Sequence, residues 1–174
     1  MSVLAVQLET PGAGFLELSR EELASAARTL AELWRSLGVA AGDRVLIYDY
    51  GSSPIVYLAS AAFTPYLDSG AAERCDALAL CVDGLPDNVG RLAHVLRLFA
   101  PGFLFLRAEL AGLLIGGPTA IAEEDRRARL VVCCGEDAPA AGERAGWQRC
   151  WPGGVFVVCE RPSRAGQLRG WEVV

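Results

Sequence analysis

The feature that most constrains the fold is the stretch from Gly38 to Asp49, where a helical pattern gives way to a buried-strand pattern within a few residues. Apolar side chains before Gly38 recur at helical spacing, and glycine is the residue that most often terminates a helix. Residues 44–48 are then nearly continuous in apolar side chains, as is typical of a parallel strand covered on both faces. Because the same change recurs down the chain, the sequence predicts βαβ units and an α/β fold.

The first helix has clear start and stop signals. Ser19 and Glu22 have the spacing of a capping box, in which each side chain satisfies a backbone N–H of the other residue. Gly38 ends the helix. Its predicted buried face consists of Leu23, Ala26, Ala27, Leu30, Leu33, Trp34 and Leu37.

The remaining elements follow from the same patterns. Strands are predicted at residues 77–82, 103–107, 130–134 and 155–159, with a short edge strand at 171–174. Helices are predicted at residues 54–63, 85–100, 108–115 and 139–149, the last with Asp137 as its cap. The charged run within 120–129 is interpreted as a solvated helix end with internal ion pairs. The predicted buried stripe of helix 85–100 is Leu85, Val89, Leu92, Leu96 and Phe99, with His94 solvated on the opposite side.

Together these elements predict a single α/β domain over residues 1–174. It contains a mainly parallel sheet of about five strands flanked by helices, in a Rossmann-like three-layer arrangement. Residues 1–18 form an N-terminal arm or hairpin, and residues 161–174 form a C-terminal tail.

Composition and charge limit the kinds of partner that this chain is expected to bind. Hydrophobic residues make up 52% of the chain, and the mean hydropathy is +0.29, so we expect either a large core or a surface covered in a homodimer or by a partner enzyme. The net charge is −5 with scattered basic residues, which argues against a nucleic-acid partner. No apolar run reaches the length of a membrane span, and residues 1–4 do not resemble a signal peptide, so we expect a cytoplasmic protein.

The residue types present exclude several kinds of chemistry. All 16 basic residues are arginine, so the chain itself has no lysine for a Schiff base or a phosphate loop. The six cysteines contain no C-x-x-C spacing and there is a single histidine, so we expect no metal site, no cofactor and reduced thiols that act as small hydrophobes.

Candidate ligand-binding residues follow the predicted strands, because open α/β sheets bind ligands at the carboxyl ends of their strands. The predicted residues are Asp49, Tyr50, Ser52 and Ser53 after the first strand, Gly135 and Glu136 after the fourth, and Glu160 after the fifth. Ser53 and Pro54 have the pattern of a helix start, whose backbone N–H groups can hold an anion.

Three motifs together resemble the adenylate-forming ligase superfamily, and its phenylacetate-CoA ligase branch in particular. The first is Ser19-Arg-Glu-Glu-Leu23, a helix, then Leu37-Gly38-Val39 and Gly42-Asp43-Arg44-Val45. The second is Phe99-Ala-Pro-Gly-Phe-Leu104 before a strand, and the third is the strand from Leu130 that ends in Gly135-Glu136. The resemblance implies that the chain is similar to one subdomain of an AMP-binding adenylation core.

The departures from that family concern its catalytic groups. The family's Ser/Thr/Gly-rich phosphate loop with its lysine, its ribose-binding aspartate and its C-terminal domain are missing from this sequence. Where the family has Tyr-Gly-x-Thr-Glu, this chain reads Val157-Val158-Cys159-Glu160-Arg161-Pro162, with Glu160 as a remnant of the magnesium-holding glutamate. Because adenylation depends on stabilising charge at the transferring phosphoryl group, we expect no adenylation by the chain alone.

The resulting hypothesis is a non-catalytic or accessory relative, a pseudoenzyme of acyl activation or secondary metabolism. It would bind a small acyl, aromatic or nucleotide-type ligand, or a partner protein. One alternative is a small enzyme that uses Glu136, Glu160 or a cysteine in the same pocket. Another is an unrelated Rossmann-like domain, which the strand order would distinguish.

Overall fold

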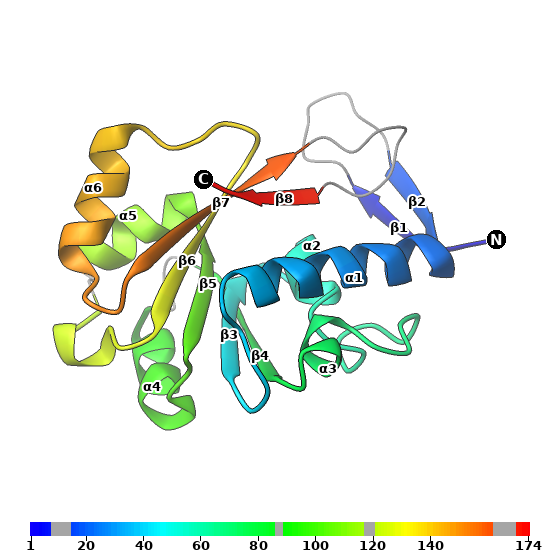
Figure 1. The fold of residues 1–174 in the computed structure, drawn as a ribbon, viewed down its shortest axis with the longest axis horizontal. Helices are drawn as coiled ribbons and strands as arrows, with labels where there is room; N and C mark the ends of the chain where they lie inside the picture. Colours follow the sequence, from blue (N-terminus) through cyan, green and yellow to red (C-terminus); the bar gives the residue numbers. More distant parts are fainter. Residues whose placement is uncertain (8–14, 86–88, 117–120, 162–169) are drawn as a thin grey trace.

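The computed structural model describes residues 1–7, 15–85, 89–116, 121–161 and 170–174 (Figure 1). Its main sheet has six strands in the order β4-β3-β5-β6-β7-β8. The strands are β3 (Arg44–Asp49), β4 (Leu78–Asp83), β5 (Phe103–Arg107), β6 (Arg129–Cys134), β7 (Val155–Arg161) and β8 (Gly170–Val173). All neighbouring pairs are parallel except β7 and β8. The predicted mainly parallel sheet and its edge strand are therefore confirmed.

Helices cover both faces of this sheet. The α1 layer consists of α1 (Arg20–Ser36), α2 (Pro54–Tyr57) and α3 (Ala71–Arg74). The α4 layer consists of α4 (Val89–Phe99), α5 (Ala108–Gly116) and α6 (Ala141–Cys150). Successive side chains of β3 point alternately towards the two helical layers. Val45 and Ile47 join the core under α1, and Leu46 and Tyr48 join the core under α4. The predicted three-layer α/β arrangement is confirmed.

The N-terminal segment forms a hairpin. Strand β1 (Ser2–Gln7) pairs antiparallel with β2 (Phe15–Ser19) as a separate two-stranded sheet (Figure 1). The turn predicted from Thr10 to Gly14 lies outside the described residues.

Helix α1 has the predicted local structure. The Ser19 N–H donates to Glu22 Oε2 at 2.8 Å, and the Glu22 N–H donates to Ser19 Oγ at 3.3 Å, so the capping box is present. Gly38 follows the helix with φ +92°, a conformation that suits glycine. All seven residues of the predicted apolar face are buried, and the Trp34 ring packs on Phe105 of β5 with centroids 5.6 Å apart.

The helix predicted at residues 54–63 is much shorter than expected. α2 ends at Tyr57, and a few turns lead to α3, which the sequence patterns did not predict. The Ser60 hydroxyl accepts the N–H of Ala62 at 3.1 Å and donates to Glu73 of α3. This side-chain bonding competes with helical hydrogen bonds, and Pro65 disfavours a helical conformation at the residue before it.

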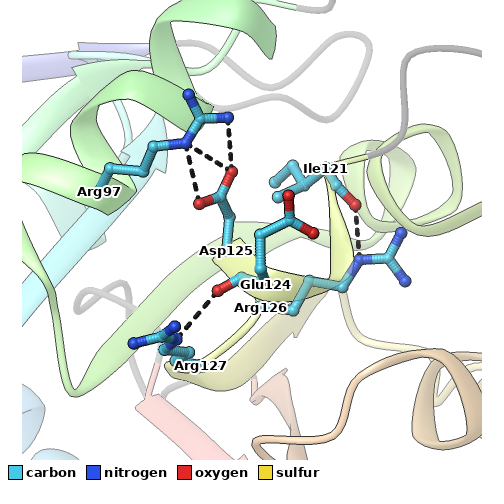
Figure 2. A network of polar contacts seen from close by, with 6 residues as sticks. All are labelled: Arg97, Ile121, Glu124, Asp125, Arg126 and Arg127. Atoms are coloured by element: carbon cyan, nitrogen blue, oxygen red, sulfur yellow. Dashed lines mark hydrogen bonds and ion pairs between the residues drawn. The ribbon is translucent and has the colours of Figure 1, made fainter.

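The charged run before β6 is a single 3₁₀ turn, η2 (Glu123–Asp125), and its charges do not pair within a helix. Asp125 instead bonds Arg97 of α4, with the Arg97 Nη2 to Asp125 Oδ2 distance 2.8 Å (Figure 2). Arg126 and Arg127 donate to the backbone carbonyls of Ile121 and Glu124, at 2.7 and 3.0 Å. The cation that pairs with Asp125 thus lies on another helix, so the predicted internal pairing was wrong for this residue.

Two smaller expectations also differ from the structure. Leu85 is 47% exposed and does not belong to the buried stripe of α4, although Leu92 and Leu96 are buried and His94 is exposed as predicted. Helix α6 begins after Ala140, whose N–H donates to Glu143 Oε2 at 3.1 Å, so Asp137 is not its cap. Among the helices that the structure describes, none has the length and apolarity needed to cross a membrane.

A glycine beside the start of β6 gives a test of the packing. A Cβ on Gly153 would lie 2.3 Å from the backbone oxygen of Ala128, whereas a Cβ on Gly146 of α6 would lie 4.0 Å from its nearest neighbour, a guanidinium nitrogen of Arg149. We expect Gly153→Ala to lower the unfolding free energy by about 1–3 kcal/mol through overpacking. Gly146→Ala, the matched control, should leave it unchanged or raise it by up to about 1 kcal/mol. Urea denaturation measures both, and equal effects would contradict the close approach.

The Arg97–Asp125 contact predicts a pH dependence of stability. The hydrogen bond from Arg97 holds the pKa of the Asp125 carboxyl below its ordinary value of 3.8. Because the pKa of Asp125 is lower in the folded state than in the unfolded state, its contact with Arg97 stabilises the fold at pH values above 3.8. This stabilisation is lost as the pH falls through the pKa of the folded state. Asp125→Asn should therefore lower the thermal midpoint at pH 7 and converge with the original protein towards about pH 3. Glu124→Gln is the control, since a similar pH-dependent loss there would indicate general charge effects.

Candidate functional site

The carboxyl ends of β3 to β7 lie along one edge of the sheet, which we call the carboxyl edge. The predicted residues fall into two groups on it, because β5 lies between β3 and β6. Asp49 ends β3 and Tyr50 follows it, and Gly135 and Glu136 follow β6 beside Glu160 of β7. Arg107, the last residue of β5, was not predicted from the sequence and joins the first group.

The first group is the Asp49–Arg107 cluster, which consists of Asp49, Tyr50 and Arg107. The Asp49 side chain is only 5% exposed, and its Oδ1 lies 3.3 Å from Arg107 Nε and accepts the Tyr50 N–H at 2.8 Å. The Arg107 guanidinium carbon lies 4.3 Å from the centroid of the Tyr50 ring. A buried carboxylate thus holds a guanidinium against an aromatic face, a geometry favourable for a cation–π contact. Arg107 remains 27% exposed, so part of it faces solvent.

The backbone of the neighbouring strand fixes the position of Asp49. The Gly84 N–H donates to the Asp49 carbonyl at 3.2 Å. A Cβ on Gly84 would lie 2.9 Å from the Asp49 Cα and from the Tyr48 carbonyl oxygen, so only glycine permits this approach. The Tyr48 hydroxyl donates to the Leu85 carbonyl and secures the same turn from the other face of the sheet.

The predicted anion site at the start of α2 is not supported. Ser53 is the N-cap and Pro54 occupies the first turn, as expected, but α2 has only four residues. The Ser53 side chain makes no capping hydrogen bond to this described helix. So short a helix has only a small dipole, which favours an anion less than a longer helix would. Ser52 is exposed beside it.

The second group, which we call the Glu136–Glu160 group, lies at the β6 and β7 ends. The Glu160 N–H donates to the Gly135 carbonyl at 3.1 Å, so the structure brings these predicted residues together. Arg161 donates to the Glu136 carbonyl at 3.5 Å and to the Glu172 carboxylate of β8 at 2.6 Å. Arg161 and Glu172 were not predicted, because their roles depend on the pairing of β8 with β7.

Cys133 and Tyr57 lie on the α1 side of the sheet, in or against its core. Cys133 pairs in register with Arg107, and burial together with the charges of Asp49 and Glu160 raises the pKa of its thiol well above the ordinary value. Burial, with a further contribution from Glu160, also raises the pKa of the buried Tyr57 hydroxyl. Burial likewise raises the pKa of Cys81 to about 12. Because the thiolate is the nucleophilic form, this environment disfavours a cysteine nucleophile in the alternative small enzyme.

Metal binding receives no support from the part of the chain that the structure describes. Within those residues no group of three or more His, Cys, Asp or Glu side chains is arranged to hold a metal ion. The arrangement along the edge instead combines a held guanidinium, an aromatic face and carboxylate oxygens.

Comparison with known proteins gives matches in fold alone. No protein-family model matches the chain, and none of the curated proteins matches it. Among solved structures, it is similar to an open conformation of 2-hydroxyisobutyryl-CoA ligase in complex with 2-HIB-AMP and CoA, with TM-score 0.62 and 14% identity over 93% of this chain and 34% of that one. The N-terminal subdomain of Klebsiella oxytoca NpsA in complex with 3-hydroxyanthranilyl-AMSN matches with TM-score 0.61 and 15% identity, over 99% of this chain and 40% of that one. Brucella canis acyl-CoA synthetase matches with TM-score 0.55 and 14% identity, over 100% and 30%.

These matches confirm the predicted resemblance at the level of the fold. The neighbours are adenylate-forming enzymes, and the likeness in fold covers nearly all of this chain. The chain spans between 30% and 40% of the length of these three structures, so its fold matches one portion of each of them.

The burial of Asp49 predicts that replacing two neighbouring aspartates lowers the stability of the fold by different amounts. Asp49 and Asp83 are register partners on adjacent strands, but Asp83 is exposed. Asp49→Ala should lower the unfolding free energy by about 1–3 kcal/mol, because it leaves the Tyr50 N–H and Arg107 without their buried acceptor. Asp83→Ala should change it by no more than about 0.5 kcal/mol. Urea denaturation compares the two, and equal losses would show that Asp49 does not organise this edge.

Proposed function

We propose that this chain is a non-catalytic relative of the adenylation core that binds a small aromatic acid at its carboxyl edge. The observation that carries the proposal is the Asp49–Arg107 cluster, where a buried carboxylate holds a partly exposed guanidinium beside the Tyr50 ring. In this proposal Arg107 receives the ligand carboxylate and Tyr50 contacts its ring.

The charge along the carboxyl edge limits further which class of ligand could bind there. Among the described residues named along it, carboxylates (Asp49, Asp83, Glu109, Glu136, Glu160 and Glu172) outnumber the guanidinium groups of Arg107 and Arg161. Such surroundings oppose the multiple negative charges of a nucleotide's phosphates more strongly than the single charge of a carboxylate, and their oxygens accept hydrogen bonds from an amino or hydroxyl group. We therefore favour an amino- or hydroxyl-substituted aromatic acid over a nucleotide. Among the structural neighbours, NpsA is solved with 3-hydroxyanthranilyl-AMSN and AuaEII, an anthranilate CoA ligase, with anthranoyl-AMP.

The absence of catalysis is proposed from the sequence. The chain has no lysine, and the family's phosphate loop and Tyr-Gly-x-Thr-Glu motif are not found in it. Adenylation requires stabilisation of the charge on the transferring phosphoryl group, and an acidic edge opposes it. A homodimer or a partner enzyme of acyl activation remains the predicted assembly.

The proposal predicts which arginine controls binding. Isothermal titration of the purified chain with 3-hydroxyanthranilate or anthranilate should show binding, and Arg107→Gln should weaken it by roughly tenfold or more, since a hydrogen bond to a charged group contributes about 1.5–3 kcal/mol. Arg97→Gln is the matched control, because Arg97 is an ion-paired arginine at the opposite end of the strands. Equal affinity in the two variants would reject Arg107 as the carboxylate-binding group.

Further measurements on the same sample separate the remaining alternatives. ATP-dependent release of pyrophosphate with any acid of the panel would contradict a non-catalytic role. Tighter binding of ATP, AMP or CoA than of the aromatic acids would contradict the charge argument. The mass of the native protein reports whether it is a dimer.

A further inference from the structure

Two buried cysteines face each other on neighbouring strands of the α4 side of the sheet. Cys134 of β6 and Cys159 of β7 are direct register partners in a parallel pair. Both belong to the core under α4, where Cys134 is 7% exposed and Cys159 is 0% exposed. The cysteines next to them do not share this position: Cys133 packs on the opposite face, and Cys150 is exposed on α6.

We propose that Cys134 and Cys159 form a reversible disulfide that ties β6 to β7. Neighbouring strands lie about 4.8 Å apart. That spacing is within the roughly 4.4–6.8 Å between Cα atoms that a disulfide spans. The next rung of the same ladder is the hydrogen bond from the Glu160 N–H to the Gly135 carbonyl. The disulfide would therefore lock the two strands directly beneath the Glu136–Glu160 group.

The surroundings favour this neutral product over a thiolate–metal complex. Burial raises the pKa of Cys134 to about 12, and the charges of Glu109 and Glu143 act in the same direction. An apolar site flanked by carboxylates disfavours any thiolate, whereas an S–S bond carries no charge. The same environment makes oxidation slow at neutral pH, so its rate should rise about tenfold per pH unit as the thiolate fraction grows.

The reaction is a thiol–disulfide exchange with a low-molecular-weight disulfide as the oxidant. The Cys134 thiol, the more exposed of the two, loses its proton and attacks one sulfur of the small disulfide, which releases one small thiol and leaves a mixed disulfide on Cys134. The Cys159 thiol then loses its proton and attacks the Cys134 sulfur, which forms the protein disulfide and releases the second small thiol. Two protein thiols are oxidised and one small disulfide is reduced to two thiols. An excess of small thiol reverses both steps.

Peptide mapping tests the proposal directly. Trypsin cleaves after arginine, so residues 130–144 carry Cys133 and Cys134, and the peptide that begins at Cys150 also carries Cys159. The experiment therefore uses Cys133→Ala/Cys150→Ala, in which only the proposed pair remains on these peptides. After incubation with oxidised glutathione at alkaline pH, alkylation in denaturant and digestion without reductant, we expect the two peptides to be joined, with a mass lower by two hydrogen atoms. Dithiothreitol should separate them.

A matched variant and a stability measurement make the outcome decisive. Adding Cys134→Ala to the same background should abolish the linked peptide. The oxidised protein should have a higher thermal midpoint than the reduced one, because the bond constrains the unfolded chain. Full alkylation of Cys134 and Cys159 after oxidation would overturn the proposal, as would a link that persists without Cys134. The result does not depend on whether the carboxyl edge binds an aromatic acid.

Discussion

The contact between Asp49 and Arg107 is the interaction on which the carboxyl edge depends. A carboxylate that is 5% exposed is costly to bury unless it is paired, and here the Arg107 guanidinium at 3.3 Å and the Tyr50 N–H at 2.8 Å compensate it. The two side chains belong to adjacent parallel strands, so the contact also fixes how β3 and β5 end relative to each other. The ring of Tyr50 then covers the guanidinium, and Gly84 lets the next strand approach closely enough to hold the Asp49 backbone.

Local sequence signals predicted the elements whose stabilising contacts lie within a few residues. Ser19 and Glu22 cap α1 through each other, and Gly38 ends it with a backbone conformation that glycine adopts readily, so both ends of α1 were predictable. The continuous apolar residues of β3, β5 and β6 predicted buried parallel strands for the same kind of reason, because each strand is covered on both faces. Where the determining contact was distant in sequence, the prediction failed. The end of α2 depends on Ser60 and Glu73 of α3, and the charged run pairs with Arg97 of α4.

For the candidate site too, residues set by local sequence were predicted and residues set by contacts distant in sequence were missed. The rule that ligands bind at the carboxyl ends of parallel strands identified Asp49, Tyr50, Gly135, Glu136 and Glu160, and the structure places all of them along one edge. Arg107 was missed because its importance comes from the strand order, which puts β5 between β3 and β6 and cannot be read from a single sequence. The available signal was a charged residue at the end of the apolar run Phe103–Leu106. Arg161 and Glu172 depend on the antiparallel pairing of β8, which is likewise a long-range contact.

The fold and the chemistry of this chain rest on largely different residues. The three layers are held by apolar side chains within the strands and by helices such as α1, whereas charge at the edge comes from residues that end or follow the strands. Exposed edge residues such as Glu136 and Asp83 contribute little to folding, so an adenylation-type architecture does not require adenylation-type groups at those positions. Asp49 and Arg107 are the exception, because one is buried, the other is partly buried, and their pairing serves both the packing of the strands and the character of the edge. In the proposed binding mode, a ligand at Arg107 would act on the same contact that stabilises the ends of β3 and β5, so binding and local stability would be coupled there.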